Sequence, residues 1–348
     1  MAMTVRMIMI LLYGAGGVPG RGEIPMNTVQ HTVTQVFPVR RKPPQGASRT
    51  NTADIYIAVF KNSYEIYKEG GKAKMPNCKT IAVCNQKGGT GKTTTTVNLG
   101  IGLARLGKKV LLVDADPQGD LTTCLGWRDN DGLTTTITDK LSEIMREENT
   151  NPQSGILHHE ENVDLLPANL ELSAMEMMLV TTMSRETVMR NYLSKVKDNY
   201  DYVLIDCMPS LGMVTLNALA AADSVIIPVQ AQYLPAKGMT QLMQTIGKVK
   251  QHINPSLKID GILLNIVDNR TNLAKSTADA LRQNYGSVIK IYRSSIPMAV
   301  KAAEVASKGV SIYKYEPNSP AAKAYAELAK EVLADGRKKE RLHAADAR

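Results

Sequence analysis

The chain has 348 residues, of which 43% are hydrophobic, and a formal charge of +9. This length accommodates one large domain or two modest ones with a substantial core. Two phenylalanines and one tryptophan argue against an aromatic platform for stacking nucleic-acid bases, so any contact with DNA is expected to be electrostatic. No apolar run approaches the roughly 20 residues of a membrane-spanning helix, and the four cysteines lack the C-x-x-C spacing of a zinc site.

Residues 1–74 differ in character from the rest of the chain. They show no sustained helical or strand period, and they hold ten basic against four acidic side chains, whereas residues 75–348 hold 32 against 29. One interpretation is a disordered basic arm. The other is a translated leader, because the codons for residues 68–71 can contain a bacterial ribosome-binding sequence just before Met75. We expect translation to start at Met75, a single domain over residues 75–336, and a charged tail over 337–348.

From residue 79 onward, short runs rich in Ile and Val alternate with longer helical stretches. Continuous apolar strands indicate a sheet that is covered on both faces, so the pattern predicts a doubly wound α/β domain with a mostly parallel sheet. Ligands of such a sheet bind at the carboxyl ends of the strands. The predicted strands are residues 81–84, 110–113, 163–166, 202–205, 225–229, 262–267 and 288–292.

The stretch QKGGTGKTT, residues 86–94, follows the first strand and precedes a helix predicted over residues 93–106. It matches the phosphate-binding pattern G-x-x-x-x-G-K-[ST] except that Gln86 replaces the first glycine. In such loops the backbone N–H groups surround phosphate oxygens, the lysine reaches the β and γ phosphates, and the hydroxyl ligates Mg²⁺. Residues expected to bind the nucleotide are Gly88, Gly89, Thr90, Gly91, Lys92, Thr93 and Thr94, with Thr93 also on the metal.

Carboxylates follow two further strands. Asp114 and Asp116 end the second strand, and because they are one residue apart they should point in different directions and differ in role. One can orient the loop or the metal shell while the other faces the γ phosphate and positions water. Asp206 ends the fourth strand, the usual place of a Mg²⁺ partner in phosphate-loop enzymes. Cys207 has no histidine nearby to activate it, so a packing role is expected.

Three ordered motifs, K-G-G-x-G-K-T-T, V-D-x-D-P-Q-G and D-x-x-P-S, together resemble the ParA/Soj family, deviant Walker-type P-loop ATPases that partition plasmids, chromosomes and integrative elements. The resemblance covers residues 79–334 and implies ATP and Mg²⁺ as cofactors and an ATP-dependent homodimer. It makes Lys87 the signature lysine, which contacts the partner subunit's nucleotide. It further implies that Asp116 positions the water with support from Asp114, that Asp206 holds the Mg²⁺ water shell, and that Asn265 and Pro297 form the adenine pocket.

The same resemblance implies DNA binding without sequence preference, through basic residues that two subunits bring onto one face. It also implies a weak ATPase activity that a ParB-like centromere-binding partner stimulates, and a cytoplasmic, nucleoid-associated protein. Arg270, in a predicted loop after an apolar strand, is the best individual candidate for a DNA contact. The full candidate set is Lys237, Lys248, Lys250, Arg270 and Lys275.

Two rival classes share the nucleotide chemistry. A MinD-like membrane-cycling ATPase needs a C-terminal amphipathic helix with bulky apolar residues. The present C-terminal helix, predicted over residues 321–333, is rich in Ala, and its apolar stripe of Tyr325, Leu328, Val332 and Leu333 is expected to dock on the domain. A reductase resembling the nitrogenase iron protein needs cysteines at the two-fold axis, and neither Cys124 nor Cys207 stands in that context.

Overall fold

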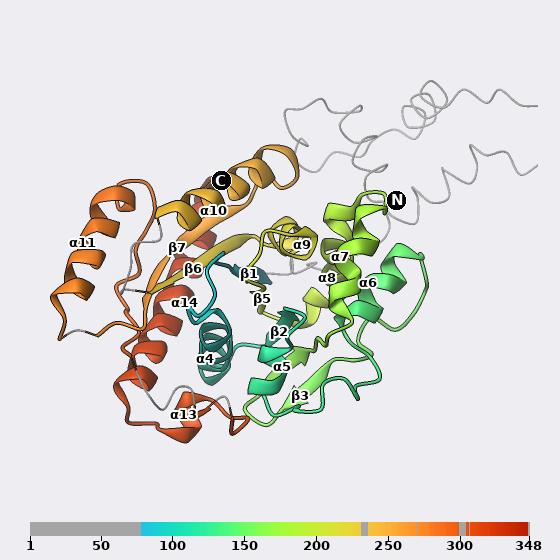
Figure 1. Cartoon of the computed structure of the whole chain (residues 1–348), viewed down its shortest axis with the longest axis horizontal. Helices are drawn as coiled ribbons and strands as arrows, with labels where there is room; N and C mark the ends of the chain where they lie inside the picture. The colour runs from blue at the N-terminus through green and yellow to red at the C-terminus, as the bar shows by residue number, and fades with distance from the viewer. Residues whose placement is uncertain (1–77, 231–235, 269, 299–303, 306, 347–348) are drawn as a thin grey trace, which may run out of the picture. The chain divides into compact units, whose positions relative to one another are not determined.

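The computed structural model describes residues 78–230, 236–268, 270–298, 304–305 and 307–346, so the expectations for residues 1–74 lie outside it. One compact unit spans Pro76–Arg348. Its seven-stranded sheet has the order β3-β4-β2-β5-β1-β6-β7 and is parallel except for the β3–β4 pair, as the apolar runs predict (Figure 1). The strands are β1 Lys79–Val83, β2 Val110–Ala115, β3 Leu157–His159, β4 Val163–Leu166, β5 Tyr202–Cys207, β6 Ser224–Gln230 and β7 Lys258–Asn265.

Helices cover both faces of the sheet, which confirms the doubly wound architecture. Along β2, Leu111 and Val113 belong to one buried cluster and Val110 and Leu112 to the other, so the period-two alternation serves two apolar layers. The described helices are α4 Lys92–Arg105, α5 Asp120–Cys124, α6 Ile137–Met145, α7 Leu172–Val180, α8 Val188–Val196, α9 Met213–Ala221, α10 Ala236–His252, α11 Asn272–Tyr285, α13 Ile312–Tyr315 and α14 Pro320–Asp346.

Helix α4 is held closely between the sheet and the C-terminal helices. A Cβ atom on Gly100 would lie 2.5 Å from Cδ2 of Leu112 in β2, and one on Gly102 would lie 2.5 Å from Oη of Tyr313 in α13 and 3.1 Å from Cβ of Ala329 in α14. Both glycines therefore permit close packing of the helix that follows the phosphate-binding motif. Figure 1 shows α4 between the sheet and α14.

The strand register brings three strand ends together. Val83 of β1 pairs with Asp206 of β5, and Asp206 pairs in turn with Asp114 of β2. The parallel direction therefore puts the phosphate-binding motif and both strand-end carboxylates at one edge of the sheet.

Two sequence predictions were wrong in detail. Residues 288–292 form no strand; the segment meets β7 only at an isolated bridge from Ile291 to Ile262, and Val288 is 86% exposed. Its apolar residues make one short contact with the edge of the sheet and do not form a buried strand. The short antiparallel β3 was not predicted, and α14 continues thirteen residues beyond residue 333, through the basic sequence RKKER.

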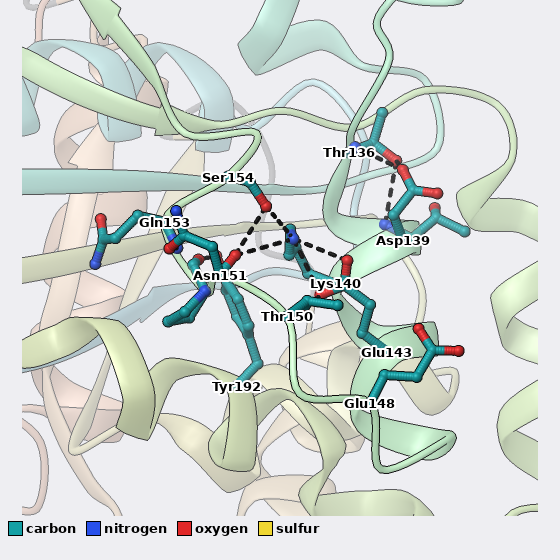
Figure 2. Close-up of polar contacts among 12 residues, drawn as sticks. Thr136, Asp139, Lys140, Glu143, Glu148, Thr150, Asn151, Gln153, Ser154 and Tyr192 are labelled. Atoms are coloured by element: carbon teal, nitrogen blue, oxygen red, sulfur yellow. Dashed lines mark hydrogen bonds and ion pairs between the residues drawn. The ribbon is translucent and has the colours of Figure 1, made fainter.

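A buried lysine fixes the connection between α6 and β3. Nζ of Lys140 donates to both carboxylate oxygens of Glu143 at 2.9 and 3.0 Å, to the carbonyl of Asn151 at 3.3 Å and to Oγ of Ser154 at 2.6 Å (Figure 2). The lysine is 1% exposed, and next to it the hydroxyl of Tyr192 in α8 donates to the carbonyl of Pro152. These bonds satisfy the buried ammonium group and attach the connection to two helices.

Replacing Lys140 by Met is expected to lower the free energy of unfolding by about 2 kcal/mol, because Glu143 loses its cation and Ser154 and Asn151 lose a donor. Lys330 is the matched control, since it also pairs with a glutamate three residues away but lies exposed. Lys330→Met should change the free energy by less than about 0.5 kcal/mol. Urea unfolding of the two variants checks this, and equal effects would contradict the structural role of Lys140.

Candidate functional site

The phosphate-binding motif forms a tight turn between β1 and α4. Gly89 and Gly91 take positive φ angles of 70° and 79°, the left-handed conformation that side chains with a Cβ atom rarely adopt. Lys92 begins α4, is buried, and its Nζ lies 3.5 Å from the carbonyl oxygen of Lys87. The free N–H groups of the helix start and the lysine together create a positive site that suits phosphate.

Asn265, at the end of β7, joins the last strand to this turn. Its Nδ2 donates to the carbonyl of Thr90 at 3.0 Å and also lies within 3.4 Å of the carbonyl of Gly91 and Oγ1 of Thr95. A Cβ atom on Gly91 would lie 2.3 Å from this nitrogen. Position 91 therefore requires glycine for two separate reasons, its backbone conformation and the space that Asn265 occupies.

The two carboxylates that follow β2 have different surroundings. Asp114 is fully buried and accepts from the hydroxyl and N–H of Thr122 at 2.7 and 2.9 Å and from the N–H of Asp116 at 3.2 Å. Burial raises the pKa of Asp114 to about 7. Asp116 is half-buried, accepts from the N–H of Gln118 at 3.1 Å and has its pKa raised by burial. Asp114 thus anchors the turn that presents Asp116.

Asp206 is the third carboxylate and lies beside the start of α4. It is buried, the hydroxyl of Thr96 approaches it at 3.4 Å, and the nearby hydroxyl of Thr93 acts to lower its pKa. Burial, and secondarily the neighbouring Asp114, raises the pKa of Asp206 to about 8, while the charge of Lys92 opposes the shift. The Thr93 hydroxyl and the Asp206 carboxylate are hard oxygen donors, which suits Mg²⁺.

A cavity of about 320 Å³ opens beside the phosphate-binding turn. Both Asn265 and Pro297 line it, together with Thr94, Ile266 and Tyr325. Ile266 has φ of 55°, an uncommon conformation for a β-branched residue, and its N–H donates to Oδ1 of Asn265. The Asn265 side chain is therefore committed to backbone groups, so it shapes the cavity wall. Adenine recognition by Asn265 and Pro297 stays a prediction.

The basic residues predicted to contact DNA are dispersed. Lys248 and Lys250 are both exposed on α10, but a rotation of about 100° per residue puts them on opposite sides of the buried Val249. Lys275 is exposed on α11. Arg270 is exposed, and its Nε and one terminal nitrogen each donate to Asp268 at 2.9 Å, so a phosphate would have to replace this carboxylate. The side chain of Lys237 lies outside the described residues.

The sequence interpretation missed Thr96 and Thr122, which bond to the carboxylates of the site, and Glu176, which bonds to the start of α9. Each of the two threonines has another threonine beside it in the sequence, and no sequence pattern distinguishes it from its neighbour. Glu176 carried a signal, since it is the single charged residue in the α7 sequence LSAMEMMLV. A lone charge in an apolar helix usually has a specific partner.

Gly91→Ala is expected to lower the free energy of unfolding by about 2 kcal/mol, since the methyl group combines an unfavourable φ with the contact to Asn265. Gly88→Ala is the matched control from the same turn, because a Cβ atom there meets nothing within 4 Å. It should change stability by less than about 0.5 kcal/mol. Chemical denaturation without nucleotide checks both variants, and equal losses would contradict the packing of Asn265 against Gly91.

The free energy of unfolding without nucleotide or Mg²⁺ is expected to fall as pH rises from 5 to 8. The raised pKa values of Asp114 and Asp206 mean that the folded state holds more protons than the unfolded state in this window, so stability decreases with pH. Each carboxyl contributes at most about 1.4 kcal/mol per pH unit. Asp206→Asn should flatten the slope in urea unfolding, and an unchanged slope would contradict the buried acid.

Comparison with known proteins agrees with this geometry. A family model described as an AAA domain matches residues 78–259. The chain is 44% identical over 258 residues to the sporulation initiation inhibitor protein Soj of Bacillus subtilis (strain 168), covering 74% of this chain and 99% of that protein. It is 40% identical over 263 residues to the chromosome-partitioning ATPase Soj of Treponema pallidum (strain Nichols), covering 75% and 99%.

Similarity extends to solved structures. The crystal structure of cobyrinic acid a,c-diamide synthase from Mycobacterium smegmatis, with bound ADP and magnesium, aligns with a TM-score of 0.64 and 36% identity. The alignment covers 74% of this chain and 94% of that one. The phosphate-binding turn that contains Lys87 and the carboxylates at two neighbouring strand ends agree with these relatives, which the chain matches over nearly their whole length. This chain therefore belongs to the ParA/Soj family of partition ATPases.

Proposed function

We propose that this protein is a Mg²⁺-dependent ATPase that dimerises on ATP, binds DNA without sequence preference and segregates a plasmid, chromosome or integrative element. The observation that carries the proposal is the convergence of Lys92, Thr93, Asp116 and Asp206 on one turn at the carboxyl edge of the sheet. The name of the Treponema relative, a chromosome-partitioning ATPase, supports both the reaction and the process.

Each side chain has a separate task in hydrolysis. Lys92 and the N–H groups that open α4 hold the phosphates, and the Lys92 charge stabilises the negative charge that develops during transfer. Asp116 orients the attacking water, and Asp114 keeps the Asp116 turn in place through Thr122. Thr93 and Asp206 would hold Mg²⁺, which when bound neutralises phosphate charge. We expect a slow intrinsic rate, which a ParB-like partner accelerates.

Lys87 links nucleotide binding to dimerisation in this proposal. Its N–H donates to Oδ1 of Asn85 at 3.0 Å and its carbonyl lies next to Nζ of Lys92, so the backbone at Lys87 belongs to the phosphate-binding turn. A lysine attached so closely to one nucleotide site can cross a dimer interface and contact the phosphates in the partner subunit's site. In a dry interface this charge is strongly stabilising.

The C-terminal helix favours DNA over a membrane as the surface to which the dimer binds. Tyr325, Leu328 and Val332 of α14 are buried in the same apolar cluster as α4, so this stripe is already used inside the domain. Among the described residues, no helix combines the length and the apolar character needed to cross a bilayer. The similarity to a chromosome-partitioning ATPase is our reason for proposing a cytoplasmic protein associated with the nucleoid.

Co-sedimentation with DNA at moderate salt tests the proposal. ATP is expected to drive binding, whereas ADP and the nucleotide-free protein should leave most of the protein in the supernatant. Lys87→Ala should lose the ATP-dependent binding, because the dimer no longer forms. Anionic liposomes are tested in parallel. ATP-dependent binding to the liposomes and not to DNA would contradict the proposal and assign the protein to the MinD-like branch.

Arg270→Glu separates the DNA contact from dimerisation in the same assay. It should weaken DNA binding about tenfold or more while ATP-dependent dimerisation, followed by light scattering, persists. Arg282→Glu is the matched control on α11, since Arg282 is also exposed and paired with an aspartate. If both arginines behave alike, or if Arg270→Glu abolishes dimerisation, Arg270 is no specific DNA contact.

A further inference from the structure

Glu176 makes a long-range contact that the chemistry above does not use. Its Oε2 accepts from the N–H of Met213 at 2.7 Å, and its Oε1 accepts from the N–H of Val214 at 2.9 Å. Met213 and Val214 are the first two residues of α9, whereas Glu176 lies on α7. One carboxylate therefore satisfies two of the N–H groups that a helix start leaves without a helical partner.

Helix α9 depends on this remote cap because it has no cap of its own. The N-cap residue is Gly212, which has no side chain to accept from the helix start. The carboxylate also carries a negative charge, which the positive end of the helix dipole favours. Glu176 thus replaces the Ser, Thr or Asp that usually caps a helix from within the same segment.

The segment that follows Asp206 ends where α9 begins. Residues 208–212 join the end of β5 to Met213, and the hydroxyl of Thr215 in α9 donates to the carbonyl of Ser210 at 2.8 Å. Asp206 fixes one end of this segment inside the sheet. The first turn of α9 fixes the other end, and the bonds from Glu176 hold that turn from outside.

We infer that Glu176 is a positioning residue for ATP hydrolysis, which acts by holding the first turn of α9 and with it the segment that follows Asp206. This inference rests on the proposed ATPase function, because it adds a support to the same site. The expected consequence is a separation of effects. Loss of Glu176 should slow turnover and leave nucleotide affinity nearly unchanged, since the phosphate-binding turn and Lys92 are attached to other elements.

The geometry around Gly212 offers a direct test. A Cβ atom on Gly212 would lie 2.6 Å from Oε1 and 2.7 Å from Oε2 of Glu176. The backbone at Gly212, with φ of −75° and ψ of −173°, is the extended conformation in which serine caps helices. A serine at position 212 therefore displaces the carboxylate at the flexible end of Glu176, and it can take over the capping role when the glutamate is absent.

The experiment compares the wild type with Glu176→Ala, Gly212→Ser and the double variant. Turnover at saturating ATP, the affinity for a fluorescent ATP analogue, and amide hydrogen exchange of Met213 and Val214 are measured for each. We expect Glu176→Ala to reduce turnover about tenfold, since displacing a group that supports the chemistry can cost up to about 100-fold, with affinity changed less than about twofold. Gly212→Ser alone should have a smaller effect, because Glu176 can move aside and the serine can cap the helix. The double variant should recover most of the turnover and of the exchange protection.

Glu171→Ala is the matched control, because Glu171 is exposed and immediately precedes α7. It should resemble the wild type in all three measurements. If Glu176→Ala speeds amide exchange but leaves turnover unchanged, or if the double variant is no better than the worse single variant, the inference is overturned. A wild type that binds but never hydrolyses ATP overturns the proposed function instead, and exchange at Met213 then still shows whether Glu176 caps α9.

Discussion

The structure depends on the burial of two carboxylates next to each other. Asp114 and Asp206 are directly paired in the register of β2 and β5, and both are buried. Burying a carboxyl group in the dry sheet is costly for its charged form, which is why the pKa of each is raised, and for Asp206 the neighbouring Asp114 adds to the shift. Lys92 and the hydroxyls of Thr122 and Thr96 offset part of this cost. A cation bound at this edge would remove the rest, so the site is shaped to gain stability from a ligand.

The elements around these carboxylates restrict how they can move. Helix α4 is packed closely on the sheet through Gly100 and on the C-terminal helices through Gly102, so its first turn keeps a fixed position. Asp114 is attached to α5 through Thr122, and the segment after Asp206 is attached to α7 through Glu176. Each functional group therefore has a support from a different part of the chain. These contacts position the functional groups before any ligand binds.

The sequence predicted the features that are encoded locally. Apolar runs indicated six of the seven strands, and the spacing from Gln86 to Thr94 indicated the phosphate-binding turn. Residues 288–292 have the same local composition but lie at the edge of the sheet. Their sequence alone does not show that this segment is partly exposed. The bonds of Lys140, Asn265 and Glu176 join residues whose proximity the fold alone creates. A local sequence pattern can mark such a residue as unusual, but it does not identify the residues that it contacts.

The contact between Gly91 and Asn265 has a consequence for how this sequence can diverge. The amide of Asn265 fills the space that any side chain at position 91 would need, and it bonds to the carbonyls around the turn. A larger residue at 91 is excluded as long as Asn265 stays, and a shorter residue at 265 leaves the carbonyl of Thr90 without its donor. Position 91 also needs glycine for its left-handed backbone, so a change at Asn265 does not free it, and descendants of this chain are expected to keep both residues.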